Sequence, residues 1–159
     1  MNTSSPAVVF LKVLTALGMA AAVLFLPILW FVSEDLAATA PEFAGLQWPY
    51  LLIGAALVVC VEVVGTALWK LLSRVAAESI FDTEALAWVN AIIGAGCAAV
   101  VLFVLALMPV AFVTHGPPAL SLALILAAAM SAAFTLLMIV MRQLLIQATS
   151  FSDEMAEVI

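Results

Sequence analysis

Four long apolar runs, separated by short polar segments, make up most of this 159-residue chain. About 20 apolar residues in a helix are enough to cross the ~30 Å hydrocarbon core of a bilayer. Each run reaches that length, so the pattern predicts four membrane-spanning helices. We place these spans at about 10–32, 49–72, 88–113 and 118–142.

The first run could be mistaken for a secretory signal peptide, because Lys12 precedes it and Ala38-Thr39-Ala40 follows it. Its apolar stretch, however, exceeds the usual 7–15 residues of such a signal. Pro41 also follows the would-be cleavage point, where its fixed backbone angle suits a protease poorly. We therefore expect a retained membrane span.

The basic residues all fall at those ends of the runs that would lie on one side of the membrane. Lys12 stands at the start of the first run, Lys70 and Arg74 at the end of the second, and Arg142 at the end of the fourth. The loop at 33–48 contains acidic residues but no Lys or Arg. Since cytoplasmic loops are enriched in Lys and Arg, this distribution predicts that both termini are cytoplasmic.

The composition excludes several classes of protein. Hydrophobic residues make up 68% of the chain and charged residues 9%, whereas soluble domains carry roughly a quarter charged residues. The net charge of −6 argues against direct binding of nucleic acid, which needs a basic surface. Cys60 and Cys97 both lie inside apolar runs, as small core residues do. We expect no metal site and no cofactor.

The polar connection between the second and third spans contains a helix-start signal. Asp82 is a suitable N-cap for a helix that begins at Thr83. Phe81 and Leu86 have the spacing of a hydrophobic staple, which would set the angle at which the chain re-enters the membrane. A docking surface for another protein is the alternative interpretation of this segment.

The tail at 143–159 continues the helical pattern beyond the last span. Its apolar residues recur at 4-3-4-3 spacing, the pattern of a heptad seam: Leu144, Ala148, Phe151, Met155 and Val158. We therefore predict that the last helix extends into the cytoplasm as an acidic, amphipathic rod. Phe151, Met155 and Val158 are its candidate partner-docking residues. Packing against the chain's own 73–87 segment, or against a second subunit, remains the alternative.

A single ionisable residue, Glu62, lies deep inside a predicted span. A charge at that depth is costly, so such a residue usually faces other helices, is neutral, or is paired. Thr66 lies one turn later, and Ser131 and Thr135 of the last span are expected at similar depth. These four residues are our intramembrane polar candidates. They predict either a hydrogen bond between helices or a proton or ligand site.

Four segments carry a resemblance to a known family: Trp69-Lys70-Leu71-Leu72, Ser79-Ile80-Phe81-Asp82, Arg142-Gln143-Leu144-Leu145-Ile146-Gln147-Ala148-Thr149 and Asp153-Glu154-Met155-Ala156-Glu157-Val158-Ile159. Through these segments the chain resembles the YoaS-like proteins, an uncharacterised family of bacterial membrane proteins with four spans. The sequence resembles those of actinobacteria. The resemblance implies the bacterial cytoplasmic membrane and genes often placed beside a Cro/CI-type helix-turn-helix regulator. It carries over no catalytic residue.

Together these observations predict one all-α integral-membrane domain over 1–159, a four-helix bundle in the lipid bilayer whose last helix is extended. The leading hypothesis is a non-enzymatic scaffold, sensor or sequestering partner of a cytoplasmic regulator, such as a helix-turn-helix protein, with homo-oligomerisation as another possible association. The alternative is a small proton-linked transporter or channel that uses Glu62. An enzyme ranks third, because no nucleophile–base pair or metal cluster is visible.

Overall fold

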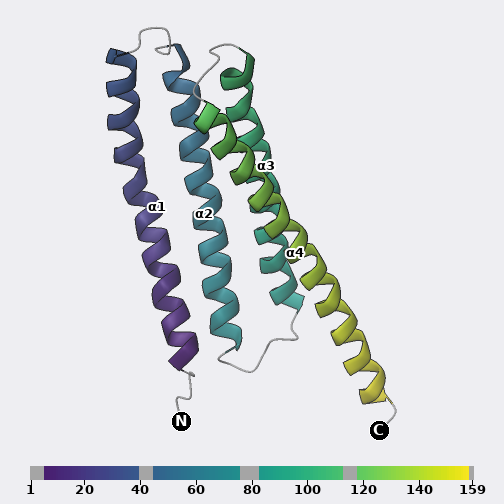
Figure 1. Cartoon of the computed structure of the whole chain (residues 1–159). Helices are drawn as coiled ribbons and strands as arrows, with labels where there is room; N and C mark the ends of the chain where they lie inside the picture. The colour runs from purple at the N-terminus through teal and green to yellow at the C-terminus, as the bar shows by residue number, and fades with distance from the viewer. Residues whose placement is uncertain (1–5, 40–44, 76–82, 113–117, 158–159) are drawn as a thin grey trace.

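The computed structural model describes residues 6–39, 45–75, 83–112 and 118–157, and these are almost entirely α-helical. The chain forms four long helices, α1 (Pro6–Thr39), α2 (Gln47–Val75), α3 (Thr83–Phe112) and α4 (Pro118–Glu157), which run alternately up and down (Figure 1). The predicted all-α class is therefore confirmed.

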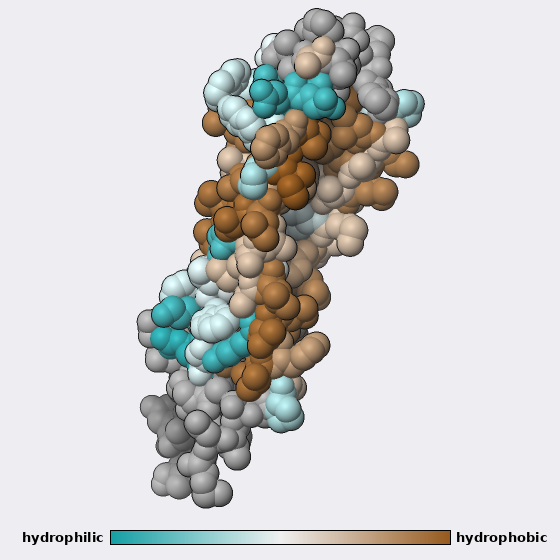
Figure 2. All heavy atoms as spheres, turned by 90° about the vertical axis from the view of Figure 1, so that its left-hand side faces the viewer, coloured by the Kyte–Doolittle hydropathy of each residue, from teal (hydrophilic) through white to brown (hydrophobic). Residues whose placement is uncertain are grey.

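Each helix contains a stretch long and apolar enough to cross a membrane. These stretches are Pro6–Asp35, Gln47–Arg74, Ala85–Val110 and Pro118–Gln147. They contain the predicted spans almost completely and extend past most of their ends. Figure 2 shows one face of the molecule that is mostly apolar over its middle, with hydrophilic residues towards both ends. Length and composition thus indicate a multi-pass membrane protein.

The helices pack in chain order as an open row. Among the described residues, extensive contact joins α1 to α2, α2 to α3 and α3 to α4, and no other pair of helices (Figure 1). The apolar stretch of α1 contains no buried residue. We predicted a four-helix bundle, and a closed bundle would also require contact between α1 and α4. Apolar helices have little hydrophobic reason to close such a bundle when hydrocarbon surrounds them.

The buried core follows the two central helices. Helix α3, which has a neighbour on each side, supplies most of the buried apolar residues, and Ile92 is fully buried. The buried apolar residues are Val58, Ala67, Ala85, Val89, Ile92, Ala95, Ala106 and Val110. Most of them are alanine or valine, so the backbones of neighbouring helices can approach closely.

The start of α3 and the end of α4 concern two of the predictions from the sequence. Helix α3 begins at Thr83, as the sequence predicted, and Leu86 in its first turns is half-buried. The proposed cap and staple residues Asp82 and Phe81 lie outside the described residues, so the cap stays a prediction. Helix α4 continues unbroken past Arg142 to Glu157. This confirms that the tail is helical.

The end of α4 stands apart from the rest of the molecule. In Figure 1 it diverges from α3 and extends beyond the ends of α2 and α3. Leu144, the first residue of the predicted seam, is 54% exposed. The side chains of Phe151 and Met155, and the whole of Val158, lie outside the part of the chain that the structure describes.

Candidate functional site

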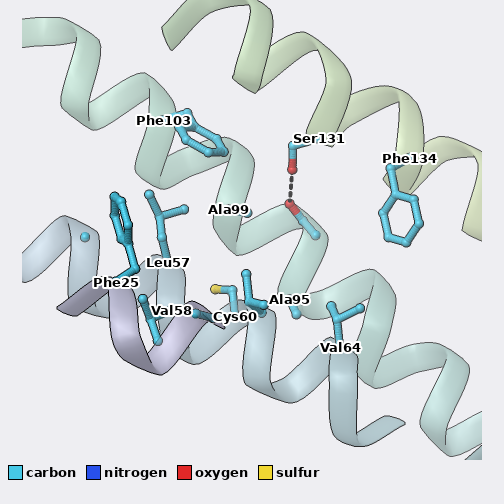
Figure 3. A pocket seen from close by; sticks show the side chains of 14 residues that line it. Phe25, Leu57, Val58, Cys60, Val64, Ala95, Ala99, Phe103, Ser131 and Phe134 are labelled. Atoms are coloured by element: carbon cyan, nitrogen blue, oxygen red, sulfur yellow. Dashed lines mark hydrogen bonds between the residues drawn. The ribbon is translucent and has the colours of Figure 1, made fainter. Parts of the chain in front are cut away.

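All four helices contribute to one hollow in the face of the row. Its volume is about 470 Å³ and it is open on one side. Figure 3 shows Phe25 of α1, Leu57 and Cys60 of α2, Phe103 of α3 and Ser131 of α4 around it. The Ser131 hydroxyl and the Cys60 thiol are the polar side-chain groups in an otherwise apolar lining. Such a surface suits hydrocarbon better than an ion or a polar substrate.

The Ser131 hydroxyl crosses from α4 to α3 at the edge of this hollow. Its Oγ donates a hydrogen bond to the backbone carbonyl of Gly96 over 3.4 Å (Figure 3). Thr135, one turn further along α4, is only 5% exposed and packs against the same glycine. Its hydroxyl donates to the Ser131 carbonyl at 2.8 Å. These two polar candidates therefore lie together, at a helix contact.

Gly96 makes that contact possible. A Cβ atom at this position would overlap the Thr135 hydroxyl oxygen. Gly94, two residues earlier on α3, has nothing within 4 Å of where its Cβ would be. The sequence showed both glycines, but it could not show which one faces α4. The structure assigns the close approach to Gly96.

The other two polar candidates, Glu62 and Thr66, lie on α2. Leu57, Val61 and Val64 of α2 line the hollow together with Ser131. Glu62 follows Val61, so it is turned about 100° around α2 from that residue. Thr66, one turn beyond Glu62, donates its hydroxyl to the Val63 carbonyl at 2.9 Å. No hydrogen bond among the described residues therefore joins Glu62 or Thr66 to Ser131 or Thr135.

Glu62 has an unusual environment for a carboxyl group. Its Oε1 atom is buried and has no hydrogen-bond partner in the structure. The predicted hydrogen bond to a neighbouring helix is therefore not made by this oxygen. The Nε atom of Arg142, near the end of the apolar stretch of α4, is likewise buried without a partner. Buried polar atoms usually have partners, so each of these two atoms calls for a physical explanation.

A second hollow lies between α1 and α2. It has a volume of about 360 Å³ and is lined by Ala16 and Met19 of α1 and by Thr66, Trp69 and Lys70 of α2. At its basic end the Lys12 ammonium lies 5.7 Å from the centre of the Trp69 ring, within range of a cation–π interaction. We call this hollow the α1–α2 groove. Along α2 it extends from Lys70 back to Thr66, which lies one turn after Glu62.

The described residues include no group of three or more His, Cys, Asp or Glu side chains that could hold a metal ion. Cys60 and Cys97 are both free thiols. What the described helices offer is apolar surface, a packed contact of hydroxyl groups and one buried carboxyl oxygen. Together with the four long apolar helices, these features indicate a multi-pass membrane protein.

The comparison with known families identifies the chain further. It belongs to the family described as "Protein of unknown function (DUF2975)", whose model matches residues 30–159. No curated protein and no solved structure matches the chain. The match covers α2, α3, α4 and the end of α1, and it agrees with the expectation of an uncharacterised family. The YoaS-like resemblance and its neighbouring regulator genes stay predictions.

Proposed function

We propose that this chain is a non-enzymatic membrane protein whose extended fourth helix docks a cytoplasmic regulatory protein at the membrane surface. The proposal places four spans in a bacterial cytoplasmic membrane with both termini inside the cell. Lys12, Lys70, Arg74 and Arg142 support that orientation, because they all lie at the end of the helix row where the chain begins and ends.

The length of α4 is the observation that carries this proposal. Its 40 residues span about 60 Å at 1.5 Å per residue, roughly twice the ~30 Å of a hydrocarbon core. The apolar stretch ends at Gln147, and the helix runs on to Glu157. A helix that leaves the membrane without a break presents its sides to soluble proteins.

The chemistry of the extension favours a protein partner over lipid. Asp153, Glu154 and Glu157 make it acidic, and anionic headgroups on the cytoplasmic side would repel it. Phe151 and Met155 occupy positions one turn apart on the same helix face. Amphipathic helices of this kind bind in apolar grooves of partner proteins. A helix-turn-helix regulator is the partner class that the family resemblance suggests.

Co-purification from native membranes tests the proposal. We expect that truncation after Thr149, and the double substitution Phe151→Asp with Met155→Asp, leave the protein membrane-inserted but release a cytoplasmic partner. The matched control is Thr149→Asp with Ala156→Asp, which adds the same charge away from the seam and should retain that partner. Retention of every interactor by the first two variants would contradict the proposal.

A transporter or channel is the second candidate, and the buried Oε1 of Glu62 is the observation that favours it. Transport sites usually combine interrupted helices with several polar groups inside the membrane. The hollow beside Ser131 has apolar walls apart from the Ser131 hydroxyl and the Cys60 thiol. We therefore place docking first.

A further inference from the structure

We propose that the α1–α2 groove binds one anionic phospholipid, with its phosphate group at Lys12 and Lys70 and an acyl chain along the apolar wall of α1. This inference does not depend on the docking function of α4. It requires only that the helices span a membrane. It rests on the charge at one end of the groove, on the depth that Trp69 marks, and on the order of polar and apolar groups along the groove.

The basic end of the groove holds ammonium groups from two neighbouring helices. Lys70 of α2 is exposed and lines the groove. The Lys12 ammonium of α1 lies 5.7 Å from the centre of the Trp69 ring, which lines the groove too. An ammonium group has three donors, so Lys12 can keep this ring contact and still donate to a phosphate oxygen. The groove therefore offers a phosphate group positive charge from both of its walls.

The carboxylates of these two helices lie away from the basic end. In the described part of α1 the acidic residues are Glu34 and Asp35, at the far end of the helix. On α2, Glu62 lies about two turns deeper than Lys70, whereas Arg74 adds a positive charge in the last turn. The described parts of α1 and α2 thus give this end a positive charge. Basic pockets between membrane helices bind anionic lipid headgroups.

Trp69 marks the depth of the basic end. Tryptophan is enriched at the level of the lipid headgroups, because its ring is amphipathic. Trp69 is 40% exposed and lies near the end of the apolar stretch of α2, which closes at Arg74. Lysine side chains near helix ends extend to the same level. Lys12 and Lys70 can therefore meet a phosphate group without entering the hydrocarbon.

Towards the middle of the membrane the wall of α1 becomes apolar. Lys12, Ala16 and Met19 follow one another at spacings of four and three, so they lie on one side of α1. Met19 packs against Gly65 of α2, where a Cβ atom would overlap its side chain. Ala16 lies between Lys12 and Met19, and its small side chain leaves room in the hollow of about 360 Å³. This order, charged and then apolar, is that of a phospholipid from headgroup to acyl chain.

A lipid suits this groove better than a second copy of the chain. Two copies related by a twofold axis along the membrane normal would bring the same lysines together at the same depth. Those like charges would repel each other. A phospholipid instead supplies the opposite charge, and it surrounds the helices of any protein that spans a membrane.

Native mass spectrometry of the delipidated full chain in mild detergent tests the proposal. The probes are phosphatidylglycerol, which is anionic, and phosphatidylcholine, which has no net charge, with identical acyl chains. We expect the wild type to bind one phosphatidylglycerol roughly tenfold or more tightly than phosphatidylcholine, since one lysine near an anionic headgroup contributes about fivefold in affinity.

Single charge removals test the headgroup contacts. Lys12→Gln and Lys70→Gln should each weaken phosphatidylglycerol binding by about fivefold and leave phosphatidylcholine binding unchanged. Arg142→Gln is the matched control, because it removes a positive charge from the same end of the row on α4, which does not line the groove (Figure 1). It should bind both lipids as the wild type does.

A bulky residue in the apolar wall tests the place of the acyl chain. Ala16→Phe keeps both lysines but fills the groove, so it should weaken the binding of both lipids several-fold. Ala16 is exposed, so the larger side chain does not disturb a buried contact. Ala21→Phe is the matched control, since Ala21 is also an exposed alanine of α1 but does not line the groove. It should leave lipid binding unchanged.

Glycerol phosphate separates a lipid from a free anion, because it has the phosphate group without acyl chains. We expect it not to displace phosphatidylglycerol, and full displacement would overturn the proposal. Equal binding of the two lipids by the wild type would do so too, as would equal losses in Lys70→Gln and Arg142→Gln. A dimer without bound lipid would show that a second copy fills the groove. Because the readout is bound lipid, loss of a protein partner does not affect it, and the two proposals fail independently.

Discussion

The hydroxyl of Tyr50 donates a hydrogen bond to the backbone carbonyl of Ala106 over 2.7 Å, which joins the start of α2 to the last third of α3. The two residues are 56 positions apart in the chain. Pro109 follows three residues after Ala106 and interrupts the regular hydrogen bonding of that turn, because proline has no N–H group. Tyr50 thus satisfies its own partly buried donor and ties α2 to the turn of α3 that leads to Pro109.

Removal of this bond should destabilise the contact between α2 and α3. We expect Tyr50→Phe to lower the free energy of unfolding by about 0.5–1.5 kcal/mol, because the ring stays and only the hydrogen bond is lost. Denaturant unfolding of the protein in mild detergent measures this change. An unfolding free energy equal to that of the wild type would show that the bond contributes nothing.

The contact between Gly96 and Thr135 gives a prediction with a built-in control. We expect Gly96→Ala to destabilise the protein by about 1–3 kcal/mol, because the added methyl group overlaps the Thr135 side chain. Gly94→Ala should be neutral or mildly stabilising, since its methyl group meets nothing within 4 Å and alanine favours helix. Thermal unfolding of both variants makes the comparison.

A second-site change tests whether that overlap is the cause. Thr135→Ala shortens the side chain that meets Gly96, so the double variant Gly96→Ala with Thr135→Ala should recover part of the lost stability. If the two losses simply added, the methyl group at 96 would be acting elsewhere in α3.

The N-cap of α3 remains a prediction that mutation can test. Helix α3 begins at Thr83, and Asp82 precedes it in the sequence, where an N-cap is expected. Asp82→Ala should cost about 0.5–2 kcal/mol of stability, and Asp82→Asn should be nearly harmless, because asparagine caps equally well. Equal losses in the two variants, measured by thermal unfolding, would instead point to a role for the negative charge.

The orientation in the membrane can be tested by chemical labelling. In a variant without Cys60 and Cys97, single cysteines at Glu42 and Ser152 are exposed to a membrane-impermeant thiol reagent in intact cells. We expect position 42 to be labelled and position 152 to be protected until the cells are opened, because the basic residues place both termini inside. Labelling of position 152 but not of position 42 in intact cells would contradict the predicted orientation.

The sequence by itself determined the helices. Their number, their approximate bounds, the start of α3 at Thr83 and the continuation of α4 past Arg142 all agree with the structure. These are local properties, because the backbone hydrogen bonds of a helix lie within its own segment and its length follows from an uninterrupted apolar run. The family match to residues 30–159 likewise depends on sequence alone.

Only the tertiary structure decided how the helices face one another. It placed Ser131 and Thr135 against Gly96, left Oε1 of Glu62 without a hydrogen bond to either, and arranged the helices as an open row. Helix α3 is apolar almost all round, so its sequence carries little periodicity to mark a buried side. The rotation of each helix depends on close contacts between residues far apart in the chain, such as Tyr50 and Ala106, and no local pattern records those contacts.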